Sequence, residues 1–412
     1  MLSREDNELL TRVGPESAMG QLMRRYWIPV ISCHQIATPD GSPSRVRILC
    51  ENLLAFRDTE GRVGLVDEKC PHRTASLYFG RNEESGIRCV YHGIKFDIQG
   101  DCVDLPCMPP GTSQAQLSSL KKSMRLKAYP CIERAGIVWA YMGHPDFKPD
   151  FPDLEWTCLP DNQIYVTRHI QECNWLQGVE GGYDAAHLTF LHGGTTDSSR
   201  RVIPSFYDVV PTDFGFVVGT GRDLGDSHIH WNANIFLMPF HKIISLVPQA
   251  AHMWVPIDDE RTMLYSITYS PDRPLQPEDM TRQLSWNGIH TENIAGTDHA
   301  IANMGNDYLI DRQLQASKQS YTGIRGLGIQ DCAIQESMGA ISDRSAENLL
   351  PTDIAIAKMR RLLLDALKNL ADGKTPPGLN PANFRVRSKR FKSLKGTSFQ
   401  LKDWCELVRH ET

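Results

Sequence analysis

Two short segments, Cys70-Pro71-His72 and Cys89-Val90-Tyr91-His92, constrain the fold of this chain more than any other feature. Sixteen residues separate the segments, and each of them pairs one cysteine with one histidine. Structural zinc sites more often pair cysteine with cysteine and histidine with histidine. Two loops that each carry a thiolate and an imidazole can instead straddle a dinuclear centre and give one ligand to each metal.

A Rieske [2Fe–2S] centre has this mixed ligand set, with two cysteines on one iron and two histidines on the other. The spacing therefore predicts a Rieske cluster, and zinc binding is the weaker alternative. The predicted cluster ligands are Cys70, His72, Cys89 and His92.

This stretch, with the glycine and the tyrosine beside His92, resembles the cluster-binding segment of aromatic-ring-hydroxylating oxygenases. Respiratory Rieske proteins carry two further cysteines, which form a disulfide beside the cluster. This chain has Ala75 and Tyr91 at the matching positions, so that disulfide cannot form. The resemblance therefore implies the oxygenase or ferredoxin type.

The bulk composition is that of a soluble globular protein. A length of 412 residues suggests two domains, and 41% hydrophobic residues suffice for their cores. The net charge of -5 gives no basic surface for nucleic acid. The chain starts without an apolar signal segment, has no apolar run of membrane-spanning length, and carries 11 cysteines without a disulfide framework. These features predict a cytoplasmic protein.

The pattern along the chain predicts an α+β fold with a small antiparallel β-domain around the cysteine–histidine segments. Short apolar runs separated by turn residues predict the β-domain, and a later set of strands with helices predicts a larger catalytic domain built on an antiparallel sheet surrounded by helices. The predicted parts are an N-terminal helical segment over 1–26, a Rieske domain over 27–146, a linker over 147–160 and a catalytic domain over 161–412.

A second group of candidate ligands lies on a helix predicted to open near Asn174 and to continue to His192. Apolar neighbours suggest that this helix is buried, and buried acids are rare unless they are paired or bind a metal. His187 and His192 lie about 140° apart on a regular helix, so the helix must bend, bulge or end between them if both bind one ion. The polar residues at steps of three, four and three are Gln177, Glu180, Asp184 and His187.

Two histidines, a carboxylate and open positions describe the facial triad of non-haem Fe(II) oxygenases, although histidines satisfied within the core are an equal alternative on spacing alone. The stretch also resembles the mononuclear-iron motif of the oxygenase family named above. That resemblance implies that Asp331 supplies the carboxylate. A solvated acidic loop is the alternative. The rival carboxylates are Glu336, Asp343 and Asp311.

By the same resemblance, Asp184 is not a ligand but a catalytic link between subunits. The matching aspartate of the family hydrogen-bonds a Rieske histidine of the neighbouring subunit and an iron-binding histidine of its own. The resemblance therefore implies that Asp184 joins His92 of one subunit to His187 of the next, in a ring that is most simply a homotrimer. A carboxylate can accept hydrogen bonds from both imidazoles.

The resemblance covers nearly the whole chain and implies the terminal oxygenase component of a Rieske oxygenase, of the phthalate dioxygenase-like branch. Such a component uses O2 to hydroxylate an aromatic, often carboxylated, substrate. Its electrons come from a separate NAD(P)H-dependent reductase, for which flavin and iron–sulfur groups are candidates. Residues 219–225 miss the dinucleotide-binding spacing. The alternatives are an O-demethylating monooxygenase of a methoxylated aromatic acid and a Rieske electron carrier.

A carboxylated substrate would need a cationic side chain in the catalytic domain to bind it. Any single arginine or lysine is, however, more often a surface charge than a substrate contact. The candidates are Arg200, Arg201, Arg222 and Lys242, with His241 beside them.

Overall fold

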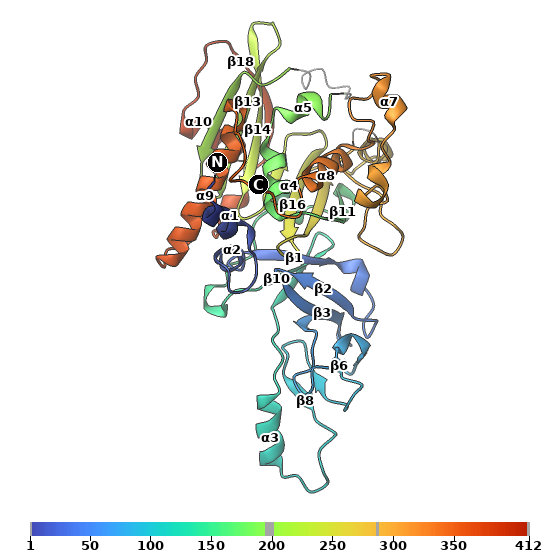
Figure 1. Ribbon diagram of the computed structural model, residues 1–412. Coiled ribbons are helices and arrows are strands. Elements are labelled where there is room, and N and C mark those ends of the chain that lie inside the picture. Colours follow the sequence, from blue (N-terminus) through green and yellow to red (C-terminus); the bar gives the residue numbers. More distant parts are fainter. Residues whose placement is uncertain (1, 194–201, 286–287, 410–412) are drawn as a thin grey trace. The chain divides into compact units, whose positions relative to one another are not determined.

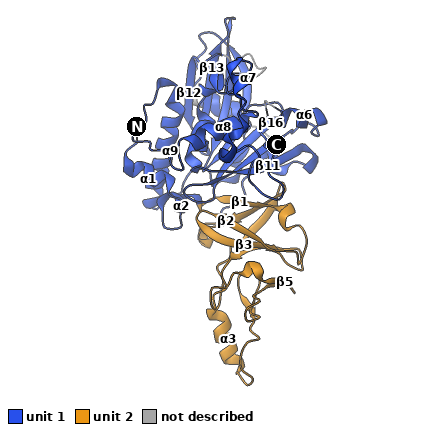
Figure 2. Ribbon diagram, turned by 45° about the vertical axis from the view of Figure 1, so that its right-hand side comes forward, with its two compact units in different colours: residues 1–23, 149–412 blue, residues 24–148 orange. Residues whose placement is uncertain are grey.

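The computed structural model describes residues 2–193, 202–285 and 288–409. The chain forms two compact units, one of residues 24–148 and one of residues 1–23 together with 149–412 (Figure 2). The N-terminal helices and the stretch from 149 to 160 thus belong to the same unit as the large sheet. Asp153 and Glu155 contribute to this arrangement through ion pairs with Arg385 and Arg387.

The smaller unit consists of three antiparallel sheets with strand orders β1-β10-β9, β2-β3-β4 and β5-β6-β7-β8. Three of its hairpins turn through two residues of positive φ, the type I′ geometry that matches the twist of the strands. The strands are β1 (Trp27–Ser32), β2 (Ser44–Ile48), β3 (Glu51–Arg57), β4 (Val63–Asp67), β5 (Arg81–Glu83), β6 (Gly86–Arg88), β7 (Lys95–Phe96), β8 (Cys102–Asp104), β9 (Cys131–Arg134) and β10 (Ile137–Tyr141).

One helix of this unit, α3 (Gln114–Ser123), has no counterpart in the sequence-based prediction. A capping box between Ser113 and Gln116 stabilises its first turn. None of its residues is buried, so its sequence has only a weak form of the apolar periodicity that indicates a helix.

In its described part, the larger unit contains an eight-stranded antiparallel sheet (Figure 1). The order is β11-β17-β16-β15-β14-β13-β12, and β18 pairs with the first part of β14 while β15 pairs with the last part. This sheet and the small β-unit confirm the predicted α+β fold. The strands are β11 (Ile164–Gln171), β12 (Phe206–Pro211), β13 (Gly215–Asp223), β14 (His228–Leu237), β15 (His241–Ile244), β16 (Gln249–Pro256), β17 (Thr262–Tyr269) and β18 (Lys389–Leu394).

Helices pack on this sheet and on one another. The long helix α9 contacts β12 and β13, and α4 contacts both β16 and α8. The described helices of the unit are α1 (Arg4–Thr11), α2 (Ala18–Met23), α4 (Trp175–Tyr183), α5 (His187–Phe190), α6 (Pro277–Gln283), α7 (Arg312–Ala316), α8 (Leu327–Ser337), α9 (Ile354–Ala371) and α10 (Leu401–Val408).

Two glycines allow α4 to lie directly on the sheet. A Cβ atom at Gly178 or Gly182 would lie 2.2 or 2.7 Å from the indole of Trp254 on β16. On the same face of the sheet, Gln171 donates to the Gln335 side chain of α8 at 2.5 Å. The sheet therefore fixes α4 and α8 beside each other, and these two helices lead to the second group of candidate ligands.

The helix predicted to open near Asn174 and to continue to His192 is divided into two, and the second helix ends at Phe190, which meets the expectation that the helix bends, bulges or ends between His187 and His192. The helix begins where expected, because the Asn174 side chain accepts from Leu176 N–H at 3.1 Å. It ends at Tyr183, however, and Asp184 has an extended backbone with ψ of 113°. A short second helix, α5, then begins at His187.

Candidate functional site: two metal centres

The first cysteine–histidine segment forms a tight loop closed by two backbone hydrogen bonds. Cys70 N–H donates to Ala75 C=O, and Thr74 N–H donates back to Cys70 C=O, both at 2.9 Å. The loop Cys89–Ile94 repeats both bonds at the same positions, at 2.8 and 2.9 Å. The two predicted cluster segments thus share one backbone pattern.

The side chains of the two loops separate thiols from imidazoles. Cys70 and Cys89 are each 2% exposed and belong to the hydrophobic core of the small unit. Burial, with the neighbouring Cys89 thiol, raises the pKa of Cys70 to about 11. His72 is exposed, His92 is half-buried, and their ring centroids lie 4.5 Å apart. A paired set of thiols inside and of imidazoles outside fits the donor set of a Rieske cluster.

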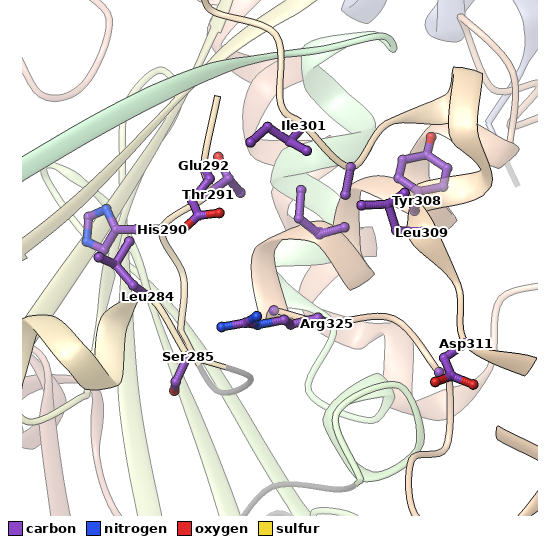
Figure 3. Close-up of a pocket in the computed structure, with 14 residues that line it drawn as sticks. Leu284, Ser285, His290, Thr291, Glu292, Ile301, Tyr308, Leu309, Asp311 and Arg325 are labelled. Carbon is purple, nitrogen blue, oxygen red and sulfur yellow. The ribbon is translucent and has the colours of Figure 1, made fainter. Parts of the chain in front are cut away.

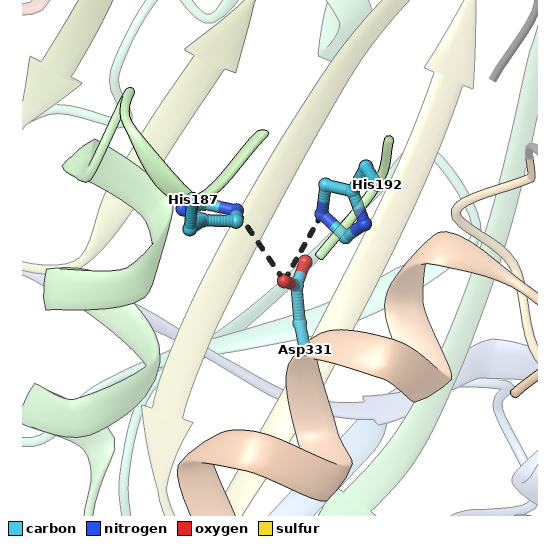
Figure 4. A group of neighbouring side chains, drawn as sticks. All are labelled: His187, His192 and Asp331. Carbon is cyan, nitrogen blue, oxygen red and sulfur yellow. Dashed lines mark ion pairs between the residues drawn. The ribbon is translucent and has the colours of Figure 1, made fainter. Parts of the chain in front are cut away.

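His187, His192 and Asp331 form the second group (Figure 4). One ligand atom from each residue lies within 4.8 Å of the other two, and among the described residues no other set meets this criterion. The Nε2 atoms of His187 and His192 lie 3.5 and 3.2 Å from Asp331 Oδ1. Two imidazoles and one carboxylate that converge in this way fit a mononuclear iron with open positions.

The end of α5 between the two histidines is what allows them to face one point. Asp184 Oδ1 accepts from the N–H groups of Ala186 and His187 at 2.8 and 3.3 Å, so its side chain satisfies backbone donors directly before and at the start of α5. The new helix ends at Phe190, and His192 follows in a turn. The 140° separation expected on one straight helix therefore does not apply.

Each imidazole has its other nitrogen near a different oxygen. His187 Nδ1 lies 3.5 Å from Asp184 Oδ2, and His192 Nδ1 lies 2.7 Å from Gln330 Oε1. The sequence analysis did not identify Gln330. The position of Gln330 directly before Asp331 was the sequence feature that could have indicated its place beside the iron ligands.

The electrostatics of the second group favour an ionised carboxylate. Burial alone would raise the pKa of Asp331, but His192 and His187 lower it to about 2. The pKa of Asp184 also lies below its ordinary value, because His187 and backbone N–H groups outweigh the effect of burial.

Two polar residues of the predicted helical face have structural partners. Gln177 donates to the carbonyls of Gln335 and Gly339, both at 2.9 Å. Glu180 accepts from Arg344 at 2.8 Å and from Arg360 at 2.6 Å, and these buried cations hold its pKa below the usual range despite burial. Both residues attach α4 to distant parts of the chain.

The rivals of Asp331 are also engaged elsewhere. Glu336 accepts from Tyr308 at 2.5 Å and from the backbone N–H of Glu172 at 3.1 Å. Asp343 accepts from Ser345, and Asp311 caps α7. None of these three rivals belongs to the converging group.

Comparison with known families divides the chain into two matched regions. Residues 26–130 match the Rieske [2Fe-2S] domain, and residues 140–204 and 212–412 match the LigXa C-terminal domain like family.

This chain belongs to the Rieske non-haem iron oxygenases.

Among relatives of this oxygenase, the 3-chlorobenzoate-3,4-dioxygenase oxygenase subunit of Comamonas testosteroni is 37% identical, and the alignment covers 97% of each chain. The phthalate 4,5-dioxygenase oxygenase subunit of Pseudomonas putida is 34% identical over 98% of this chain and 95% of its own. The structure of NdmA from Pseudomonas putida CBB5, a QL mutant with caffeine, shares the fold with a TM-score of 0.62 and 16% identity, over 87% of this chain and 94% of that one.

The family membership confirms the predicted enzyme class. The oxygenase is a terminal oxygenase subunit whose cofactors are a Rieske 2Fe–2S cluster and a mononuclear Fe(II). In its described residues, no helix has both the length and the apolar character needed to cross a membrane.

The residues predicted to bind a substrate carboxylate lie in different environments in the oxygenase. Arg200 and Arg201 lie outside the described residues. Arg222 is 2% exposed and donates to the carbonyls of Val202 and Ala185, which is a structural role. His241 is buried, and burial lowers its pKa to about 3.

Lys242 lies on the face of the sheet that carries α4. It donates to the Gly182 carbonyl at the end of α4 and pairs across the strands with His252 of β16. His252 in turn pairs with Ser266 of β17, and its Nδ1 lies 3.2 Å from the Ser266 hydroxyl. Burial and then Lys242 lower the pKa of His252 to about 4, while Asp331 is close enough to oppose them. His252 was not identified from the sequence.

A separate cavity of about 350 Å³ lies at the first turn of α8 (Figure 3). Its lining includes apolar residues such as Leu284 and Leu309, with Arg325, Asp311 and Glu292 as charged members. The lining does not include the three converging residues of the second group. Arg325 is thus a cation of the catalytic unit that the sequence analysis missed.

Proposed function

We propose that this oxygenase hydroxylates an aromatic carboxylate with O2 and with electrons from a separate NAD(P)H-dependent reductase. The observation that carries the proposal is the presence, in one chain, of twin cysteine–histidine loops and of the converging group His187, His192 and Asp331. The names of the two relatives, a 3-chlorobenzoate and a phthalate dioxygenase subunit, support an aromatic acid as the substrate.

In this proposal the cysteine and histidine loops hold one cluster between them. Cys70 and Cys89 would hold the buried iron, and His72 and His92 the outer one. The converging group would hold Fe(II) and leave positions open for small molecules. Together, the two centres supply the electrons for reductive activation of O2.

Asp184 is the proposed link between centres in neighbouring subunits of a homotrimer. Its side chain is 27% exposed, so one side of the carboxylate can contact His187 while another remains available for the partner subunit's His92. The carboxylate has enough lone pairs to accept from both imidazoles in addition to its backbone donors. It would orient both histidines and shorten the path for an electron.

Lys242 and His252 are the proposed contacts for the substrate carboxylate. Both belong to central strands, and both retain solvent-accessible surface. The Lys242 ammonium supplies the positive charge. The lowered pKa of His252 keeps its imidazole neutral near pH 7, so it can donate or accept a hydrogen bond without adding charge beside Asp331.

The test is substrate-dependent O2 uptake coupled to NADH oxidation, with a panel of benzoates, phthalates and methoxybenzoates and with product masses. A gain of two oxygens and two hydrogens is expected for dihydroxylation, and release of formaldehyde would instead identify a demethylase. A chain that binds about two irons rather than three would be an electron carrier, because a lone Rieske cluster accounts for two. O2 uptake with neutral aromatic compounds alone would overturn the proposal that the substrate is an aromatic acid.

A further inference from the structure

We propose that Gln330 is a positioning residue for the mononuclear iron, because it determines which nitrogen of His192 carries the proton and thereby presents Nε2 to the metal. This inference depends on the proposed iron site. Gln330 is 5% exposed and His192 is 3% exposed, and Gln330 Oε1 lies 2.7 Å from His192 Nδ1.

The second hydrogen bond of Gln330 fixes the orientation of its amide. The Nε2 group donates to the carbonyl of Ile324 at 2.8 Å. A carbonyl can only accept, so the opposite orientation would set two oxygens against each other. The atom that faces His192 is therefore the amide oxygen, which also can only accept.

The proton on His192 follows from that orientation. Because Oε1 accepts, Nδ1 must donate, and a neutral imidazole with a proton on Nδ1 has its lone pair on Nε2. His192 Nε2 lies on the side of Asp331, 3.2 Å from Oδ1. The lone pair thus points to the place where the three ligand atoms converge.

The loop that carries the Ile324 carbonyl, the acceptor for Gln330, has hydrogen bonds of its own. Ile324 N–H donates to the Thr322 hydroxyl at 3.1 Å, and glycines of positive φ stand on both sides, at Gly323 and Gly326. Both Ile324 and Thr322 are buried. The path from this loop through Gln330 to His192 is therefore a continuous, buried series of hydrogen bonds, as expected of groups that orient metal ligands.

The experiment compares Gln330→Leu and Gln330→Glu with Gln335→Leu by Fe(II) affinity in chelator competition, using the full-length protein with its Rieske cluster intact. Loss of such a support should weaken Fe(II) binding by about 10–100-fold in Gln330→Leu. Gln330→Glu should lose less affinity than Gln330→Leu, because its carboxylate still accepts from Nδ1 even though it no longer donates to the Ile324 carbonyl. Gln335 is a matched control on the same helix, since it is 6% exposed and accepts from Gln171 without touching a proposed ligand.

Equal losses in Gln330→Leu and Gln330→Glu would reduce Gln330 to a packing role and overturn the proposal, as would unchanged affinity in Gln330→Leu. If Gln330→Leu does not fold, the tautomer decides, read from ¹⁵N shifts of histidine in the metal-free wild type. A His192 without a proton on Nδ1 would overturn the proposal, and a proton on Nδ1 is expected. A wild type that never binds a third iron would overturn the proposed function itself, which is a distinguishable result because no substrate enters these measurements.

Discussion

The four proposed cluster ligands lie within 23 residues of sequence, from Cys70 to His92, whereas the three proposed iron ligands span 145, from His187 to Asp331. The cluster loops are closed by their own backbone hydrogen bonds. The iron group instead depends on side chains far away in sequence, such as Arg344 on Glu180. One centre is therefore built locally, and the other is assembled by the tertiary fold.

The largest expected effect comes from removing the distant carboxylate. Asp331→Ala should bind no mononuclear iron and should lose more than about 100-fold of its activity, since loss of an outer partner alone costs up to that much. Iron content and substrate-dependent O2 uptake are the measurements. The Rieske absorption spectrum should be unchanged, because the cluster loops are closed locally.

Asp343→Ala is the matched control, since Asp343 accepts from the neighbouring Ser345 and lies outside the converging group. If Asp331→Ala kept its third iron, a different carboxylate would have to complete the site.

His72→Cys tests the local centre in the same way. A third thiolate should shift the visible and EPR spectra from Rieske-like toward the all-cysteine ferredoxin type, or the cluster should be lost. If the cluster forms, its potential should fall by at least about 250 mV, from the Rieske range to that of plant-type ferredoxins. The mononuclear iron should still bind. A Rieske spectrum that did not change would remove His72 from the ligand set.

The contrast between the centres also explains which metal ligands could be predicted from the sequence. The spacing of Cys70, His72, Cys89 and His92 predicts a loop pair because few residues intervene and turn chemistry is local. The partners of His187 and His192 were harder to predict, since Gln330 and Asp331 lie on α8, far away in sequence, and the tertiary fold brings them near. The resemblance to the family, rather than spacing, supplied Asp331.

The break in the helix before His187 was not predicted from the sequence, for a related reason. The Asp184 side chain accepts from the backbone N–H of Ala186 outside the helix, yet in sequence it occurs at the spacing of a helical face. Gln177 and Glu180 at that spacing bind backbone carbonyls and arginines rather than a metal. A periodic pattern of polar residues cannot distinguish these roles, because each of them places a polar side chain on the same side.

Asp184→Asn should separate the link from the two centres that it is proposed to join. Asparagine keeps the shape but offers one acceptor and one amide donor, so it cannot accept from two imidazoles as a carboxylate does. Both metals should load, and oxidation of the reduced cluster in a single turnover with substrate and O2 should slow by about 10–100-fold. Loss of the third iron would make Asp184 a ligand, and wild-type rates would refute the link.

Asp226→Asn provides the control for Asp184→Asn. Asp226 pairs with His230 at 3.0 Å in the same unit, so the variant also replaces an aspartate beside a histidine. Neither residue belongs to the converging group. Its single-turnover rate should equal that of the wild type.

The smallest effects should come from the position at which both loops have a positive φ but one has glycine and the other threonine. Gly93 has φ of 75° and a Cβ there would lie 2.8 Å from the Pro106 ring, while Thr74 holds the equivalent place with φ of 58°. Gly93→Ala should lower the free energy of unfolding by about 1–3 kcal/mol, from the left-handed backbone and the contact with Pro106. Thr74→Gly should be nearly neutral, because relief of about 1–2 kcal/mol of backbone strain is offset by the greater freedom of glycine in the unfolded chain. Thermal unfolding of the cluster-loaded protein measures both variants, and equal losses in the two would mean that the loops are not equivalent.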